Sequence, residues 1–392
     1  MGEQPLYDLA PLLELMALGA VIALAPLLWV WRRNRGAGSA RRLQALGLLT
    51  LFLTFDLVMF GAFTRLTDSG LGCPDWPGCY GNASPLGASH EIAMAEAAMP
   101  TGPVTLSKAW VEMIHRYLAT MVGVLIIALT VLAWREHRQT PLRGARHPAW
   151  ATFTLFWVLV QGAFGALTVT MKLFPAIVTL HLLGSLFLLV LLCVQAVGHQ
   201  QAVLQQPATA ISRPLRAGLW AVLALLFAQV ALGGWVSTNY AVLACSTFPD
   251  CNGSWWPEMN FAQAADIWRP LGLLSDGTTI SFAALTAIHY IHRLAAYAVI
   301  AAVLLLVYAL RKQPALASQR KWLLGLIALQ FATGLSNVVL DWPLLAAVLH
   351  TGGAAALVTV MTWALAATRT RSSALALQED HNAPHGARSI AA

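Results

Sequence analysis

Nine long apolar runs constrain this chain more than any other feature of its sequence. A helix that crosses the ~30 Å hydrocarbon core of a bilayer needs about 20 predominantly apolar residues. Runs of that length cover 10–31, 44–66, 110–134, 149–171, 175–198, 216–238, 284–310, 321–340 and 345–367. Only 10% of the residues are charged, compared with roughly 25% in soluble domains. The sequence therefore predicts an all-α polytopic membrane protein.

Lysine and arginine residues mark one side of the membrane. They number five in loop 32–43, four in 135–148, two in 199–216, four in 311–321 and three in the C-terminal tail. These segments alternate along the chain, so they share a side, which the positive-inside rule assigns to the cytoplasm. In a bacterial inner membrane the N-terminus is then periplasmic and the C-terminus cytoplasmic. Because the net charge of +7 arises in these loops, it does not indicate nucleic-acid binding.

The sequence repeats internally. A shift of 172 positions superposes glycines, prolines and cysteines of the two longest polar loops, and a shift of 169 superposes a later set. Examples are Cys73 on Cys245, Cys79 on Cys251, Gln161 on Gln330, Gly165 on Gly334 and His181 on His350. Because each unit crosses the membrane an even number of times, the two units have the same orientation. They are predicted to be related by a pseudo-two-fold axis along the membrane normal.

The repeat sets the predicted boundaries. Residues 44–198 form a first four-helix unit and residues 199–367 a second. Residues 1–43 are an extra N-terminal helix and cytoplasmic loop, retained because no basic segment or cleavage site marks them as a signal peptide. Residues 368–392 have no apolar period and are expected to be a disordered cytoplasmic tail.

Four histidines lie inside predicted spans, two in each unit: His115, His181, His292 and His350. An ionisable group inside a span is costly and is by default a functional candidate. Each lies roughly five to eight residues inside the outer end of its helix, or about 8–12 Å deep. Two histidines at one depth on different helices match bis-imidazole ligation of a haem, whereas zinc or copper would need three or four converging ligands. Hydrogen bonding between helices remains an alternative.

An acidic residue distinguishes the first unit. Glu112 precedes His115 by three residues, and the matching position before His292 holds His289. Residues i and i+3 share a helix face, so Glu112 is directed toward the same site as His115. It could relay protons there. Alternatively, it could be structural, paired with Arg116 or with a neighbouring helix.

Arg116 and Arg293 each follow a histidine directly. A guanidinium at that position could bind a haem propionate near the outer interface. The alternative is that both side chains extend to lipid headgroups.

The cysteines form two Cys-x5-Cys pairs, Cys73 with Cys79 and Cys245 with Cys251, both in loops assigned to the outside. In an oxidising compartment each pair is expected to form a disulfide. A structural link and a redox-active pair are both open interpretations. Cys193 lies in an apolar run and is expected to be buried.

Several of these segments resemble the heme A synthase family, the membrane enzymes that convert haem O to haem A for terminal oxidases. The similar segments are GAFTRLTDSGLGCPDWPGCYG, EMIHRYLATMVG, VTLHLLGSL, IHYIHRLAAY and VLHTGG, and the resemblance covers about residues 44 to 367. It implies that His115 and His181 face the substrate haem and that His292 and His350 ligate a haem b. It also implies an essential carboxylate at Glu112 and the family's loop pair at Cys73 and Cys79. The first helix, and a second cysteine pair that many members lack, depart from the family pattern.

The resemblance implies an oxidoreductase that converts a methyl substituent of haem O to a formyl group by successive hydroxylation. The implied partners are haem O, the lipid bilayer, haem O synthase and an electron donor, and homo-oligomer formation stays open. A non-enzymatic diheme cytochrome b is the rival interpretation. It is disfavoured because a protein that conducts electrons across the membrane stacks its haems at two depths, whereas the four histidines lie at one depth. A transporter built on repeats is also disfavoured, because its binding site would use broken helices, which this sequence lacks.

Overall fold

The computed structural model describes residues 10–139 and 146–370. Nine of its helices are long and apolar enough to cross a membrane, which confirms the predicted all-α polytopic fold for these residues. They are α1 (Ala10–Arg33), α2 (Ser39–Leu66), α4 (Leu106–Gln139), α5 (Ala149–Thr170), α6 (Pro175–Leu204), α7 (Arg213–Thr238), α9 (Phe282–Leu310), α10 (Ala317–Val339) and α11 (Leu344–Ala366). A 3-10 turn, Pro314–Leu316, precedes α10.

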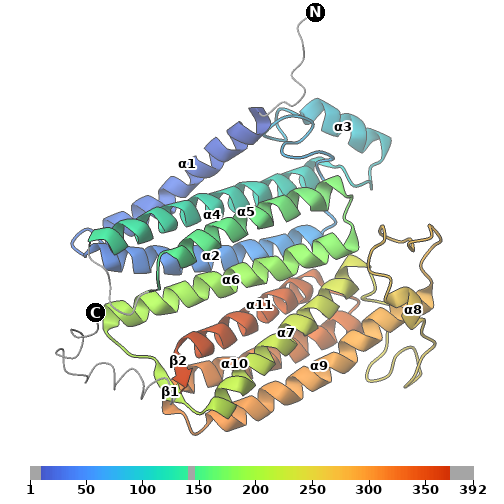
Figure 1. Ribbon diagram of the computed structural model, residues 1–392. Helices are drawn as coiled ribbons and strands as arrows, with labels where there is room; N and C mark the ends of the chain where they lie inside the picture. The colour runs from blue at the N-terminus through green and yellow to red at the C-terminus, as the bar shows by residue number, and fades with distance from the viewer. Residues whose placement is uncertain (1–9, 140–145, 371–392) are drawn as a thin grey trace, which may run out of the picture.

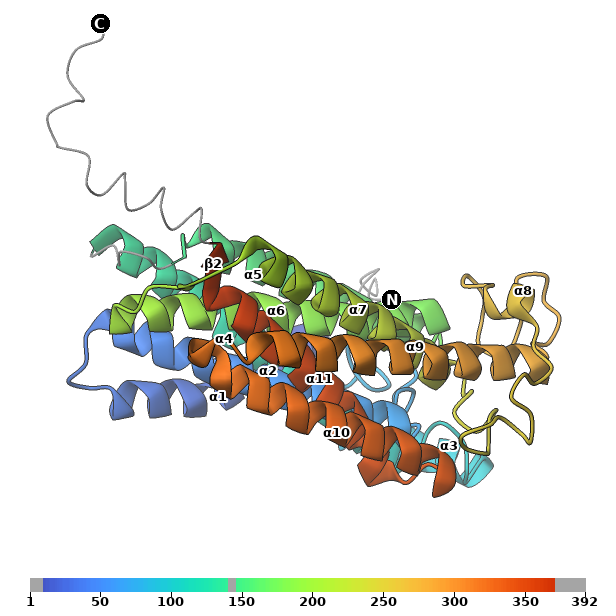
Figure 2. The ribbon, with the colours of Figure 1, turned by 90° about the horizontal axis from the view of Figure 1, so that it is seen from below.

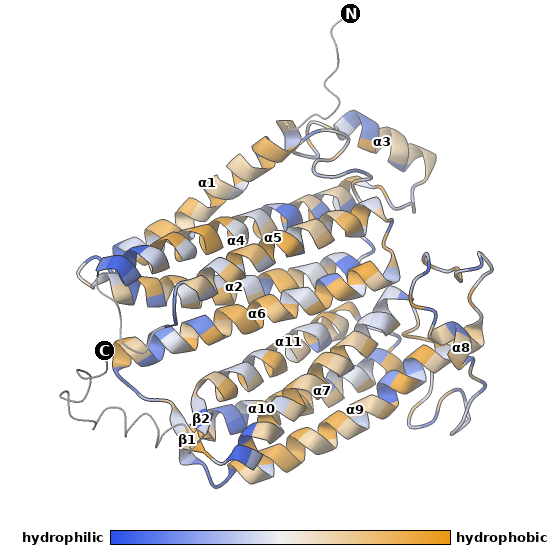
Figure 3. Cartoon of the chain, viewed as in Figure 1, coloured by the Kyte–Doolittle hydropathy of each residue, from blue (hydrophilic) through white to orange (hydrophobic). Residues whose placement is uncertain are grey.

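The long helices are apolar on their outer faces as well as inside. Phe156, Leu159 and Leu305 are 57%, 66% and 71% exposed, and Figure 3 shows hydrophobic residues over most of each long helix. Water would disfavour such a surface, whereas lipid does not, and helices satisfy their own backbone hydrogen bonds in the bilayer. Polar caps and prolines define several helix starts. The side chain of Ser281 accepts from the Ala284 amide at the start of α9, and Pro175 opens α6.

The helices pack as two rings of four. In the first ring α2 and α5 each pack against both α4 and α6; in the second α7 and α10 each pack against both α9 and α11. The seam between the rings is formed by α2 and α6 on one side and α7 and α11 on the other. Helix α1 lies outside this arrangement, against α4 and α2 (Figure 1).

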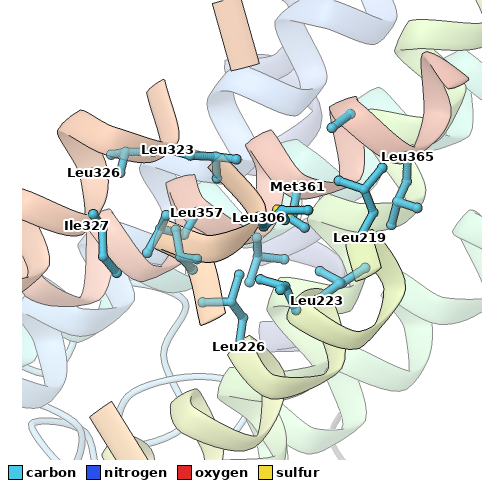
Figure 4. Close-up of a cluster of buried hydrophobic side chains, with 14 of the residues drawn as sticks. Leu219, Leu223, Leu226, Leu306, Leu323, Leu326, Ile327, Leu357, Met361 and Leu365 are labelled. Carbon is cyan, nitrogen blue, oxygen red and sulfur yellow. The ribbon is translucent and has the colours of Figure 1, made fainter. Parts of the chain in front are cut away.

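One large apolar cluster fills the second ring and its seam. Figure 4 shows leucines from α7 (Leu219, Leu223, Leu226), α9, α10 and α11 meeting around Met361. Leu226, Ile327 and Leu357 belong to this cluster and also line the functional pocket described below. The packed core therefore ends where the pocket begins.

Short elements lie at the two ends of the bundle. Figures 1 and 2 show α3 (Ser89–Ala98) and α8 (Phe261–Ala264) at one end. At the other end, β1 (Thr209–Ile211) pairs in parallel with β2 (Thr368–Thr370). The tail was expected to lack structure from residue 368, but its first three residues form β2. The rest of the predicted tail, 371–392, lies outside the described residues.

The two rings share unusual local backbone. Eight of the nine non-glycine residues with positive φ among the described residues occur as four pairs at matching repeat positions. The pairs are Asp68 with Tyr240, Tyr80 with Asn252, Lys172 with Asp341 and Leu173 with Trp342. Non-glycine residues rarely adopt this conformation, so matched occurrences are what a repeat predicts. The division into two homologous units stays a prediction that these pairs support.

Matching positions also contact each other across the seam. The Tyr240 hydroxyl donates to Asp68 (2.7 Å), and Nη2 of Arg65 donates to the Ser237 carbonyl (2.6 Å). Each pair is separated by 172 positions, as expected for residues close to a pseudo-two-fold axis. Burial raises the pKa of Tyr240, which keeps its hydroxyl protonated as a donor.

Candidate functional site

One large pocket runs through both rings. It has a cavity volume of about 860 Å³ and is lined mostly by apolar side chains of α2, α4, α5 and α6 and of α7, α9, α10 and α11. All four predicted histidines, together with Glu112, Arg116 and Arg293, line it. A pocket of this size and character suits a large, flat, apolar ligand with a few polar groups.

Two of the four histidines line the pocket in each ring. His115 on α4 and His181 on α6 belong to the first ring, and His292 on α9 and His350 on α11 to the second. Within each ring these two helices are not neighbours in the packing order but lie on opposite sides of the bundle. Each pair therefore spans the interior of its ring, where a flat macrocycle could lie between two imidazoles.

A glycine on an adjacent helix supports each histidine ring. A β-carbon at Gly61 would lie 3.1 Å from Cε1 of His115, and one at Gly233 would lie 2.9 Å from Cε1 of His292. The corresponding distances are 3.5 Å for Gly165 and His181 and 3.1 Å for Gly334 and His350. A side chain at Gly61, Gly233 or Gly334 would crowd the ring, whereas one at Gly165 would make an ordinary contact. The glycines thus leave room for the imidazoles.

Glu112 is buried between the pocket and the first cysteine loop. Its side chain is 4% exposed. Oε2 accepts from the Cys73 amide (2.8 Å), and Oε1 forms an ion pair with Arg116. The structural pairing with Arg116 weighed from the sequence is therefore present, and the carboxylate also lines the pocket. These contacts are compatible with both a structural and a chemical role.

The two arginines bind the cysteine loops. Arg116 donates to the carbonyls of Asp75 (3.1 Å), Pro77 (3.1 Å) and Gly78 (2.6 Å). In the second ring, the guanidinium of Arg293 donates in the same way to the carbonyls of Thr247, Asp250 and Cys245, at 2.7 to 2.9 Å. Arg116 and Arg293 are 8% and 9% exposed, so neither extends to lipid headgroups. A contact with a haem propionate stays a prediction.

His289 replaces Glu112 in the second ring. It is buried, and its Nε2 accepts from Nε of Arg293 (3.1 Å). The arginine thus binds the residue one turn earlier in both rings, but only the first ring has a carboxylate there. Both rings thus pair an arginine with a side chain one turn earlier, and that side chain is a carboxylate in the first ring and an imidazole in the second.

Both predicted disulfides are present, Cys73 with Cys79 and Cys245 with Cys251. All four cysteines are 0% exposed. Burial shields them from exchange with external thiols, which favours the structural interpretation over a redox-active pair. Cys193 is free and buried, as expected.

The extra helix α1 contributes to the pocket. Leu12, Leu15 and Met16 line it beside first-ring residues. Farther along the helix, a β-carbon at Gly19 would lie 2.7 Å from Cβ of Thr120, so α1 and α4 approach closely. The role of this helix was left open by the sequence, and its N-terminal half forms part of the pocket wall on the first-ring side.

The residues present fit a haem better than a bare metal ion. Among the described residues, no three or more His, Cys, Asp or Glu side chains cluster as a metal site would. Nδ1 of His115 and Nδ1 of His181 are buried without a hydrogen-bond partner in the described chain. Hydrogen bonding of Nδ1 to a neighbouring helix, the alternative considered from the sequence, is therefore not seen for these two histidines. The second pair does have such partners, which are considered below.

Sequence reasoning did not find several pocket residues. No role was predicted for Gly61, Gly233, Gln229 or Thr333. Their contacts depend on which side chains of different helices meet. A signal did exist for the glycines, since all four histidine-supporting glycines fall in matched repeat positions.

Known proteins resemble this chain over the ring-forming region. The model of the family described as "Cytochrome oxidase assembly protein" matches residues 44–362. The heme A synthase of Shewanella oneidensis is 37% identical over 309 residues, which cover 79% of this chain and 91% of the relative. The heme A synthase of Halalkalibacterium halodurans is 26% identical over 316 residues, with the same two coverages of 79% and 91%. The heme A synthase of Rhizorhabdus wittichii is 27% identical over 336 residues, which cover 81% and 91%. Helix α1 precedes the matched region.

Proposed function

This chain belongs to the cytochrome oxidase assembly protein family that includes the heme A synthases, and we propose that it oxidises a methyl substituent of haem O to the formyl group of haem A. One observation carries the proposal. Two histidine pairs span two rings of helices in a single pocket, and only one pair has a carboxylate one turn away. The enzyme is then an oxidoreductase, and haem O is its substrate.

We propose that the first ring, within residues 44–198, binds the substrate haem between His115 and His181. His292 and His350 of the second ring, within residues 199–367, would ligate a haem b. That cofactor supplies one-electron chemistry close to the substrate. Arg116 and Arg293, at the outer end of the pocket, would hold propionates while they bind the cysteine loops. The presence of two pocket histidines on opposite helices of each ring supports this division.

We further propose that Glu112 acts on protons at the substrate. Oxidation of a methyl to a formyl group releases protons, and a carboxylate within reach can accept one. Oε1 is held by Arg116 and Oε2 by the Cys73 amide, so the carboxylate is fixed in position beside the pocket. The position of His289 in the second ring offers no such anion. A diheme protein that only conducts electrons would not need a carboxylate in one ring and a histidine at the matching position of the other.

We propose that the protein lies in a bacterial inner membrane with its N-terminus periplasmic, its C-terminus cytoplasmic and its disulfide loops outside. The distribution of lysine and arginine supports this orientation. Haem O synthase and an electron donor would be its partners, because the substrate is apolar and each oxidation step must be coupled to electron transfer.

Pigment analysis tests the proposed function. Cells that express the chain and receive haem O should accumulate haem A, measured by pyridine haemochrome spectra of extracted pigments. The His115→Ala protein should still bind haem b, but cells that express it should make no haem A, because a histidine that holds the substrate haem is lost. Unaltered haem O with fully bound haem b in the unmodified protein would instead indicate a diheme cytochrome.

A further inference from the structure

The histidines of the two rings differ in what contacts Nδ1. In the second ring, Thr333 Oγ1 lies 3.0 Å from Nδ1 of His350, and Gln229 Nε2 lies 3.0 Å from Nδ1 of His292. In the first ring, Nδ1 of His115 and Nδ1 of His181 have no partner in the described part of the chain. The glycine supports are alike in both rings, so this contrast is not a general difference in packing.

The contrast is encoded in the sequence. The repeat shift of 172 places Gln229 on Leu57, and the shift of 169 places Thr333 on Phe164. Leucine and phenylalanine side chains have no hydrogen-bonding group. At both positions the second ring has a hydrogen-bonding side chain and the first ring an apolar one, so the first ring lacks both partners.

Thr333 has the arrangement that an iron-binding imidazole needs. Its hydroxyl donates to the Leu329 carbonyl (2.8 Å), which leaves the oxygen free to accept from Nδ1–H of His350. A partner that accepts from Nδ1–H fixes the tautomer, orients the ring and leaves the Nε2 lone pair for a metal.

Gln229 contacts His292 at two points, the backbone carbonyl and the ring. Its Nε2 donates to the His292 carbonyl (3.1 Å) and contacts Nδ1, while Oε1 is buried and has no partner among the described residues. The amide therefore holds the backbone of the ligand-bearing residue and lies against its ring.

We propose that Gln229 and Thr333 are positioning residues that lock the second histidine pair around a permanently bound haem. The absence of these groups at Leu57 and Phe164 leaves the first pair free to reorient, so that substrate haem enters and product haem leaves. This inference rests on the proposed function, because it takes the second ring as the site of the resident cofactor.

Haem retention tests the proposal in the full-length purified protein. Apomyoglobin, added as a haem acceptor, draws off haem at the rate at which the protein releases it, and pyridine haemochrome spectra identify the haem that is lost. Loss of a partner that orients a metal ligand typically weakens binding by 10–100-fold. Gln229→Leu and Thr333→Val should therefore each release haem b at least about 10-fold faster and shift its low-spin EPR signal.

Two variants serve as matched comparisons. Thr362→Val removes another buried hydroxyl and should leave both readouts unchanged. Within the described residues, this hydroxyl bonds only to the Val358 carbonyl of its own helix (2.7 Å). Leu57→Gln installs the second-ring amide beside the first pair and should slow the loss of haem O or haem A.

Unchanged haem b release and EPR in both Gln229→Leu and Thr333→Val would overturn the inference. An equal effect of Thr362→Val would do so too, because the change would then reflect helix packing. His350→Ala separates this failure from that of the proposed function. If it strips haem b while the two positioning variants do nothing, the ligand assignment stands and only the inference fails.

Discussion

The first ring, α2 with α4 to α6, and the second, α7 with α9 to α11, support their histidines alike but surround them differently. Both use a glycine against each imidazole and an arginine that binds a disulfide loop. The first has Glu112 where the second has His289, and apolar residues where the second has Gln229 and Thr333. Helix α1 lies only on the first. Under the proposed function, these few side chains would let the second ring hold a haem as cofactor and the first ring treat a haem as substrate.

The largest difference between the rings is expected when a histidine ligand is removed. His350→Ala should abolish stable haem b binding, because a buried iron would lose one of two axial ligands. His181→Ala should retain haem b and lose only the first-ring haem. Absorption spectra and haemochrome analysis of the purified variants measure both. Haem b retained with an unchanged low-spin spectrum in His350→Ala would contradict the assignment of the rings.

The disulfide loops should differ in their link to activity. Replacement of Cys73 and Cys79 by Ser should reduce haem A formation, because the Cys73 amide holds Glu112 in place. The same change at Cys245 and Cys251 should mainly lower stability, by about 2 kcal/mol for so short a loop. Haem A yield and thermal unfolding measure the two effects.

The oxidation state of the loops has its own check. Thiol labelling of the denatured, unreduced protein should modify only Cys193. Labelling of all five cysteines without reductant would show that the loops do not form disulfides in the cell.

The glycine supports offer a graded test. Gly233→Ala should disturb haem b, because its β-carbon would lie 2.9 Å from the His292 ring, closer than real contacts allow. Gly165→Ala should be milder, since 3.5 Å from the His181 ring is ordinary contact. Haem content per protein measures both, and a larger effect for Gly165→Ala would contradict the role of these glycines as supports for the imidazoles.

The smallest effect is expected at α1. Gly19→Ala should push α1 away from Thr120 at a cost of about 1–3 kcal/mol, the range for overpacking. Because α1 lines only the first-ring side of the pocket, haem O conversion should fall modestly while haem b content stays constant. A loss of haem b alone would contradict this placement of α1.

The sequence was sufficient for the features that depend on composition and spacing. Apolar runs predicted nine spans, and the Cys-x5-Cys spacing in outer loops predicted both disulfides. The repeat assigned two histidines to each unit, and all four line the pocket, while their role as haem ligands stays a prediction. It did not reveal that Arg116 and Arg293 bind loop carbonyls, or that Thr333 meets His350. Such contacts join residues of different elements, and the sequence pattern does not specify which side chains meet. The β1–β2 pair was missed for the same reason, since its strands are far apart in the chain.

Glu112→Gln provides the most direct test of the claim that the first ring performs the chemistry. The amide keeps the size of the carboxylate and can still accept from the Cys73 amide, but it cannot take up a proton. Haem A formation from haem O should fall by about 10²–10⁴-fold, the usual contribution of a general base, while haem b stays bound. His289→Gln should retain most activity. Full conversion of haem O by Glu112→Gln, or an equal loss in the two variants, would contradict the account.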